Sequence, residues 1–224
     1  MEQFKTDWLD LRLMDNMELM KQYPDGWFDL AVVDPPYGIG VSKGTWGSSN
    51  KGKVKNYGKK DWDKQPPSLK YFVELLRVSK NQIVWGGNYF DLYPSSCWIV
   101  WDKLNSADFA DCELAWTSFN TPVRKFTFRW NGMLQQNMKD KEIRFHPTQK
   151  PIPLYEWILK NYAQPNFKII DTHFGSGSIA LAVHRANVLD KMNLHLTACE
   201  IDPEYFAKSV TRIRKSISQQ VMQF

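Results

Sequence analysis

The sequence is poor in cysteine and has none of the spacings that cysteine-dependent folds require. Its 224 residues include three cysteines, Cys97, Cys112 and Cys199, and no CxxC pair. This excludes a disulfide framework and a cysteine-ligated zinc cluster, and it favours a reducing compartment. The four histidines form no pair spaced four residues apart, so we expect no metal site. The cysteines are interpreted as small, buried apolar residues.

Long hydrophobic runs are also missing. No segment approaches the roughly 18 apolar residues of a membrane span. The first residues, MEQFKTDWLD, lack the basic and apolar regions of a signal peptide. We therefore expect a cytoplasmic protein with no membrane partner. An excess of basic residues, 29 against 24 acidic ones, gives a formal charge of +5 and favours a polyanionic partner.

Continuous apolar segments alternate with helical patterns along most of the chain. The apolar segments indicate strands covered on both faces, as in a parallel sheet. They cover residues 30–34, 81–87, 97–103, 112–119, 167–177 and 194–202. Apolar residues three and four apart predict helices over 68–79, 151–163, 178–189 and 203–217. The alternation predicts a doubly wound α/β fold in one domain.

Two stretches depart from this rhythm. Residues 41–64 are rich in Lys, Gly and Ser and show no period, which predicts a long loop that is either functional or disordered. Residues 120–146 contain an alternating run over 123–128, which predicts a short ribbon inserted in the sheet.

The strand at 30–34 ends in the motif DPPY, residues 34–37. Pro36 forces Pro35 into an extended conformation, so the Asp34 carboxylate and the Pro35 carbonyl become adjacent, rigid acceptors. Ligands of open α/β sheets bind beyond the carboxyl ends of strands, where these acceptors are expected. Two acceptors suit both hydrogens of an exocyclic amine, such as N6 of adenine or N4 of cytosine. Binding both would aim the lone pair of the nitrogen at an electrophile.

Tyr37 completes this motif with a flat ring that is expected to stack on the base. A base inside a duplex cannot reach such a pocket, so the site implies base flipping. An ordinary turn explains Asp-Pro equally well, because that pair is a common turn starter. The functional interpretation therefore needs an electrophile elsewhere in the chain.

A second motif, IIDTHFGSGSIALA, joins a strand to a helix through a glycine-rich turn. It lacks GxGxxG, which argues against a dinucleotide. Gly175 and Gly177 would let the backbone approach S-adenosylmethionine closely. Glu200, at the end of a later strand, is expected to accept hydrogen bonds from both ribose hydroxyls. The competing interpretation is a structural turn followed by a solvated acid.

The order DPPY, then HPTQKP (146–151), then DTHFGSGS resembles the β group of DNA amino-methyltransferases, in particular small members from phages and prophages. The resemblance spans nearly the whole chain. It implies a Rossmann-like S-adenosylmethionine-dependent methyltransferase fold with permuted motif order and a mixed, mostly parallel sheet with helices on both faces. The segment LMDNMELM resembles an acidic motif, which would place Asp15 near the cofactor's adenine. Together the motifs predict cofactor contacts from Asp15, Thr148, Gln149, Lys150, Asp171, His173, Phe174, Gly175, Ser176, Gly177, Ser178 and Glu200.

The glycine motif departs from the usual pattern of this group. Thr172 and His173 stand where the pattern has Pro and Phe, and Ser178 stands for Thr. The glycine spacing is intact, but other side chains than usual are expected to pack around the methionine moiety. We interpret His173 as a pocket-lining residue rather than a catalytic base.

Basic residues near both motifs are candidates for binding double-stranded DNA. In the 41–64 loop, phosphate contacts are predicted for Lys43, Lys51, Lys53, Lys55, Lys59 and Lys60, with Trp46, Tyr57 and Trp62 as stacking residues. In the insert, Arg124, Lys125, Arg129 and Arg144 are predicted to contact phosphates or base edges. The insert is short, which suggests a brief target sequence, loose specificity or help from a second subunit.

Other reactions fit less well. A C5-cytosine enzyme needs a thiolate, typically after a proline, and no cysteine here follows one. Enzymes that methylate glutamine amides or guanine N2 in RNA usually have Asn in place of Asp34, and their cofactor motif comes first. N4-cytosine transfer is the closest rival, because the same geometry serves either amine. In the resembled group Asp at the first position leans towards adenine and Ser towards cytosine. A catalytically inactive DNA-binding protein is an alternative from another class.

The sequence therefore predicts direct transfer of a methyl group from S-adenosylmethionine to N6 of a flipped adenine, without a metal. Asp34, Pro35, Pro36 and Tyr37 form the predicted catalytic set. Residues 1–119 are expected to carry the target-amine half, 120–145 a recognition insert and 146–224 the cofactor half of one compact domain. A restriction endonuclease and a second copy of the chain are candidate partners.

Overall fold

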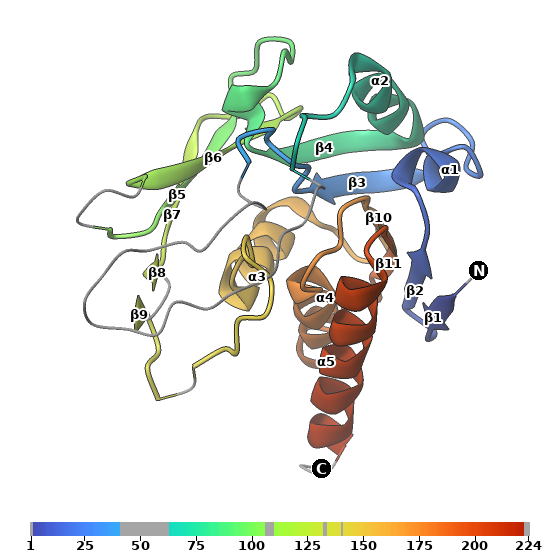
Figure 1. The fold of residues 1–224 in the computed structure, drawn as a ribbon, viewed down its shortest axis with the longest axis vertical. Coiled ribbons are helices and arrows are strands. Elements are labelled where there is room, and N and C mark those ends of the chain that lie inside the picture. The colour runs from blue at the N-terminus through green and yellow to red at the C-terminus, as the bar shows by residue number, and fades with distance from the viewer. Residues whose placement is uncertain (1, 41–62, 106–109, 132–133, 140, 222–224) are drawn as a thin grey trace.

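The computed structural model describes residues 2–40, 63–105, 110–131, 134–139 and 141–221 (Figure 1). Within these residues the chain forms one large mixed sheet, ordered β1-β2-β11-β10-β3-β4-β6-β5-β7, and a small two-stranded sheet, β8-β9. The strands of the large sheet are β1 (Gln3–Lys5), β2 (Leu9–Leu13), β3 (Phe28–Val33), β4 (Ser79–Trp85), β5 (Trp98–Asp102), β6 (Cys112–Thr117), β7 (Arg124–Thr127), β10 (Lys168–Asp171) and β11 (His195–Glu200). The small sheet pairs β8 (Trp130–Asn131) with β9 (Leu134–Gln135).

The middle of the sheet is parallel. Strands β2, β11, β10, β3 and β4 pair side by side in the same direction, whereas β1 and β6 pair antiparallel at either end of this group. The chain leaves β3 for β4 on one side and leaves β10 for β11 on the other. The boundary between β3 and β10 is therefore a topological switch point, the place where open α/β sheets bind ligands.

Helices cover both faces of the sheet (Figure 1). Helices α1 (Asn16–Met20) and α2 (Leu69–Val78) lie on one face, and α3 (Ile152–Tyr162), α4 (Ser178–Leu189) and α5 (Pro203–Val221) lie on the other. A 3-10 turn, η2 (Gly87–Tyr89), follows β4.

Alternating residues of the buried strands supply the two cores. In β3, Leu30 and Val32 belong to the cluster with α3, α4 and α5, and Ala31 and Val33 belong to the cluster with α1 and α2. Since side chains alternate across a strand, a run of apolar residues such as this one is buried on both faces. This explains why the apolar segments of the sequence lack polar alternation.

The structure confirms the expected strands and the four expected helices, with small shifts at most of their ends, but the strand expected over 167–177 ends at Asp171, where the glycine turn begins. The strand expected at 81–87 runs instead over Ser79–Trp85, because Gly86 adopts a left-handed φ of 69° and ends it. The ribbon expected in the insert was partly wrong, since β7 joins the edge of the large sheet beside β5, and among the described residues β8 and β9 pair in a separate two-stranded sheet. Strands β1 and β2 and helix α1 were not predicted from the sequence.

The cysteines follow expectation in part. Cys97 and Cys199 are buried and Cys112 is partly exposed, and all three are free thiols.

No helix in the described part of the chain is long and apolar enough to cross a membrane.

Helix α2 allows a direct test of the core beneath the DPPY strand. Leu75 is 1% exposed and packs in the cluster on the α1 and α2 side, whereas Leu69 on the same helix is 69% exposed. We expect Leu75→Ala to lower the free energy of unfolding by about 2–5 kcal/mol, because it opens a cavity. The matched Leu69→Ala should change it by no more than about 0.5 kcal/mol. Urea unfolding measures both, and equal effects would contradict this packing.

Candidate active site

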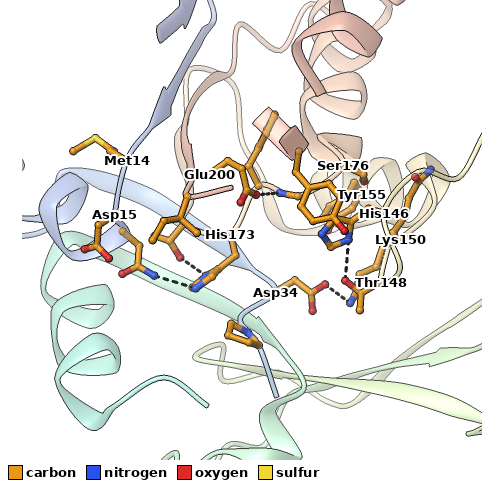
Figure 2. Close-up of a pocket in the computed structure, with 18 residues that line it drawn as sticks. Met14, Asp15, Asp34, His146, Thr148, Lys150, Tyr155, His173, Ser176 and Glu200 are labelled. Carbon is orange, nitrogen blue, oxygen red and sulfur yellow. Dashed lines mark hydrogen bonds and ion pairs between the residues drawn. The ribbon is translucent and has the colours of Figure 1, made fainter. Parts of the chain in front are cut away.

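A pocket opens at the edge of the sheet where the parallel strands end (Figure 2). Asp15 follows β2, Asp34 follows β3 and Glu200 ends β11, so three carboxylates reach it from three strands. The pocket is lined by these predicted residues: Asp15, Asp34, Pro36, Thr148, Gln149, Lys150, His173, Phe174, Gly175, Ser176 and Glu200. Segments far apart in the sequence thus meet at one site.

Five of the predicted catalytic and cofactor residues are not part of the pocket lining: Pro35, Tyr37, Asp171, Gly177 and Ser178. Pro35 is buried and Tyr37 packs behind Asp34, while Gly177 and Ser178 form the start of α4. Asp171 is buried at the end of β10, where its carboxylate accepts a hydrogen bond from the His173 backbone N–H at 3.0 Å. Burial raises the pKa of Asp171 to about 8, and the charges of Asp34 and Glu200 act in the same direction.

Two neighbours fix the Asp34 carboxylate. The Tyr37 hydroxyl donates to Oδ1 at 2.8 Å, and the Lys150 ammonium lies 2.6 Å from Oδ2. Burial raises the pKa of Asp34 above its usual value, and this rise is opposed by the Lys150 charge. Both oxygens thus have a partner and retain lone pairs for a ligand.

Lys150 was predicted to contact the cofactor, and the structure gives it a further set of partners. It is 3% exposed, and its ammonium lies 3.2 Å from Glu113 Oε2 and 5.2 Å from the centre of the Trp85 ring. Lys103 forms an ion pair with the other oxygen of Glu113. Burial opposes ionisation of Glu113, but the two lysines outweigh it and lower the pKa of Glu113 to about 2.

Backbone geometry places Tyr37. Its ring lies against Gly86, where an added Cβ would be 2.2 Å from Tyr37 Cε1. Tyr89 stacks on the same ring with centroids 5.0 Å apart, and Tyr89 is 48% exposed. A glycine at position 86 is therefore required both by its positive φ and by the close approach of the ring.

The glycine turn and Glu200 hold each other. The Gly175 N–H donates to Glu200 Oε2 at 2.8 Å, and the Asp202 N–H donates to Oε1 at 2.9 Å. Gly175 and Gly177 both have positive φ, 51° and 72°. The turn thus presents the Glu200 carboxylate to the pocket in a fixed orientation.

Arg212 of α5 joins this turn to the insert. Its guanidinium donates to the Ser176 carbonyl at 2.9 Å and to the Ser178 hydroxyl at 3.0 Å. It also forms an ion pair with Glu142 at 2.7 Å, and the other Glu142 oxygen accepts from the Ile152 N–H at 3.0 Å. The insert and the glycine turn therefore share one charged group.

His173 is neutral and engaged at both ring nitrogens. Asn16 Nδ2 lies 3.0 Å from Nε2, and Thr172 Oγ1 lies 3.0 Å from Nδ1 (Figure 2). With the Asn16 amide as donor, Nε2 accepts and Nδ1 carries the proton. Burial lowers the pKa of His173 to about 3. Tyr71 extends the network, with its hydroxyl 2.7 Å from Thr172 Oγ1.

The residues predicted to bind DNA fall into two groups. Lys43, Lys51, Lys53, Lys55, Lys59 and Lys60, with Trp46, Tyr57 and Trp62, lie outside the described residues. In the insert, Arg124, Lys125 and Arg129 are exposed. Arg144 is partly buried, donates to the Pro147 carbonyl at 3.0 Å and lies over the Trp130 ring. It is therefore engaged with the segment that carries Lys150.

Several residues at this site were not among the predicted catalytic and cofactor residues, although His146 and Thr172 belong to the quoted motifs. The further lining residues are Met14, Asn16, His146, Tyr155, Thr172, Ile201 and Tyr205. Glu113 was also missed, although a charged residue inside the apolar segment 112–119 is a signal that could have found it. Among the described residues, no group of three or more His, Cys, Asp or Glu side chains is arranged to hold a metal ion.

Comparison with known proteins agrees with this geometry. The fold is that of S-adenosylmethionine-dependent DNA methyltransferases. It is similar to the crystal structure of the M1.HpyAVI–SAM complex, with a TM-score of 0.53 and 18% identity over 91% of this chain and 99% of that one. It is also similar to PvuII DNA methyltransferase (cytosine-N4-specific), with a TM-score of 0.56 and 16% identity over 93% of this chain and 87% of that one.

The sequence comparison defines the family. The profile of the N6_N4_Mtase family, described as DNA methylase, matches residues 53–211, and the chain belongs to this family. A relative, the type II methyltransferase M2.LlaDCHI of Lactococcus lactis subsp. cremoris, is 25% identical over 76% of this chain and 78% of its own length. The protein is thus a DNA methyltransferase with S-adenosylmethionine as its cofactor.

The residues of the pocket fit this cofactor. Glu200 and Asp15 supply acceptors for hydroxyl and amine hydrogens, and the positive φ of Gly175 lets the backbone approach the ligand. Asp34 lies in the same pocket, so a cofactor bound there would lie beside its carboxylate.

The approach of Tyr37 to Gly86 predicts a selective loss of activity. Gly86→Ala should displace the ring that holds Asp34 and lower the rate of DNA methylation by about 100-fold, the cost of a misplaced group. Gly26→Ala is the matched control, because Gly26 also has a positive φ of 62° but an added Cβ would meet nothing nearer than 3.9 Å. Steady-state methylation assays compare the two, and equal rates would contradict the role of this contact.

The contacts of Glu200 predict its effect on cofactor binding. Glu200→Gln should weaken S-adenosylmethionine binding by about 1.5–3 kcal/mol, because it removes a charged acceptor and turns an amide donor towards a backbone N–H. Glu204→Gln serves as a control, since Glu204 is exposed on α5 and pairs with Lys208. Calorimetry measures both affinities, and an unchanged dissociation constant for Glu200→Gln would refute the assignment.

Proposed function

We propose that this DNA methyltransferase acts on N6 of adenine in double-stranded DNA. The observation that carries the proposal is the Asp34 carboxylate, which follows β3 directly and lines the same pocket as Glu200. An aspartate at this position has two acceptor oxygens and no hydroxyl. In the β group, which the motif order resembles, Asp at the first position of the motif leans towards adenine and Ser towards cytosine.

The chain's own groups bind and orient the amine. Asp34 accepts one N–H of the adenine amine and the Pro35 carbonyl accepts the other, so that the nitrogen lone pair points towards the cofactor side of the pocket. When bound, S-adenosylmethionine supplies a methyl group activated by its positive sulfur. The Asp34 carboxylate, which accepts an N–H of the amine, would take the proton that the amine loses when it gains the methyl group. Tyr37 holds Asp34 through its hydroxyl. Its ring packs against Gly86 and Tyr89 and is not part of the pocket lining, so the stacking on the base that the sequence predicted does not follow from this geometry.

A base in a duplex cannot reach this pocket, so the reaction requires base flipping. The exposed Arg124, Lys125 and Arg129 of the insert are proposed to contact phosphates or base edges. Residues 1–119, 120–145 and 146–224 are proposed as the target-amine half, the recognition insert and the cofactor half of the permuted β-group arrangement. A restriction endonuclease and a second copy of this chain are proposed partners.

N4 of cytosine is the second candidate target. The PvuII enzyme, whose name gives it as cytosine-N4-specific, shares the fold with a TM-score of 0.56. The two amines have the same pair of hydrogens, and one pair of acceptors serves either of them.

Mass spectrometry of nucleosides tests the proposal. Unmethylated DNA incubated with the protein and S-adenosylmethionine should yield N6-methyladenine. Asp34→Ala should abolish the product and leave cofactor affinity within a few-fold, because Asp34 binds the amine. Asp29→Ala is the control on the same strand, since Asp29 lies near the start of β3 and pairs with Lys80.

The outcomes separate the candidates. Detection of N4-methylcytosine would mean that cytosine is the target base. The proposed roles of Asp34 and Pro35 would be unchanged. Methylation by Asp34→Ala near the wild-type rate would refute the proposed site.

A further inference from the structure

Lys150 carries a buried charge next to the carboxylate proposed to bind the target amine. Its ammonium lies 2.6 Å from Asp34 Oδ2 (Figure 2). It also lies 3.2 Å from Glu113 Oε2 and 3.4 Å from the Tyr37 hydroxyl. A charge with so little access to water persists only where other groups replace its hydration. Both carboxylates are therefore part of the environment that keeps Lys150 charged.

The charges alternate in a row of four. Asp34 contacts Lys150, Lys150 contacts Glu113, and Glu113 contacts Lys103. Two positive and two negative groups balance, so no net charge is buried. Lys103 is the outer member and has 17% of its side chain exposed, similar to 15% for Asp34 at the pocket end.

The four residues come from separate parts of the fold. Asp34 follows β3, Lys150 precedes α3, Glu113 lies on β6 and Lys103 follows β5. Strand β6 pairs antiparallel with β4, Trp85 opposite Ala115, so Glu113 extends past the end of β4 to the edge where the pocket lies. Glu113 is thus held by the sheet, whereas Lys150 has a long, flexible side chain.

Glu113 limits where the ammonium can go. With Asp34 as its only anion, Lys150 could follow that carboxylate through several rotamers. A second anion on the other side, anchored by β6 and Lys103, restricts the ammonium to the line between the two carboxylates. This in turn fixes Oδ2 of Asp34, while the Tyr37 hydroxyl fixes Oδ1 at 2.8 Å.

We propose that Glu113 is a positioning residue for methyl transfer, which holds Lys150 against Asp34 and so sets the orientation of the carboxylate that binds the target amine. The proposal rests on the proposed role of Asp34. It assigns to Glu113 an effect on turnover and none on cofactor binding, because Glu113 is not part of the pocket lining.

The row of charges also predicts how the pH dependence of the methylation rate changes when the Glu113 charge is removed. The titratable groups that act on Asp34 or respond to it are Tyr37, Glu113, Lys150, Tyr155 and Asp171. Burial raises the pKa of Asp34, the Glu113 charge raises it further and Lys150 lowers it. Removing the Glu113 charge therefore lowers the pKa of Asp34. Since Asp34 binds the amine as a carboxylate, the acidic limb of the rate profile should move to lower pH.

The experiment compares Glu113→Gln and Glu113→Asp with the wild type and with Glu156→Gln. Glu156 pairs with Arg185 at 2.8 Å on the surface of α3 and serves as the control for loss of an ion pair. Glu113→Gln should lower kcat by about tenfold or more, leave the dissociation constant of S-adenosylmethionine within about twofold and shift the acidic limb to lower pH. Glu113→Asp should recover part of the rate, and Glu156→Gln should match the wild type.

A readout without turnover separates this proposal from the proposed function. An NMR titration of aspartate carboxyl carbons, with Asp34→Asn for assignment, should show a lower pKa for Asp34 in Glu113→Gln. Unchanged kcat, or a lower kcat with no shift in either the rate profile or the titration, would overturn the positioning role. If the wild type methylates no DNA base but the titration shifts, the proposed function fails and the coupling of Glu113 to Asp34 stands.

Discussion

The parallel pairing of β2, β11, β10, β3 and β4 is the constraint on which the active site depends. Parallel strands end at a common edge, so whatever follows each strand is delivered to the same place. That edge receives Asp15, Glu200, Asp34 and the Gly86 turn from segments up to 185 residues apart, between positions 15 and 200. Each motif contributes part of the pocket lining, and the sheet fixes the positions of the motifs relative to one another.

The central strands and helices were predictable from the sequence. A sheet covered on both faces requires long apolar segments in its strands and a helical period of apolar residues in its helices. It missed β1, β2 and α1, which are short and owe their positions to contacts with distant strands, as β2 does to β11. The site was predictable where a motif carries its own geometry, as in DPPY and the glycine turn. Glu113 was not, because its partner Lys150 is 37 positions away and only the sheet brings them together.

The charges of the buried acids at this site are set by the groups beside them. Neighbouring acids differ in pKa because their counterions differ. Glu113 has two lysines and its pKa falls to about 2, whereas Asp171 has a backbone N–H and two acidic neighbours and its pKa rises to about 8. His173 loses its charge to burial alone. Buried ionisable groups in and around one pocket thus differ in charge: Glu113 is held as an anion, Asp171 favours its proton and His173 is neutral.

The contact between Glu142 and Arg212 ties the segment 120–145 to the glycine turn. Glu142 belongs to the segment 120–145, and through Arg212 it reaches the carbonyl of Ser176 in the cofactor turn. Replacing that segment wholesale would leave a largely buried guanidinium without its counterion and loosen the turn it supports. The segment 120–145 therefore cannot be exchanged independently of Arg212 and the turn that it supports. A replacement of the proposed recognition segment would have to keep Glu142 together with Arg212.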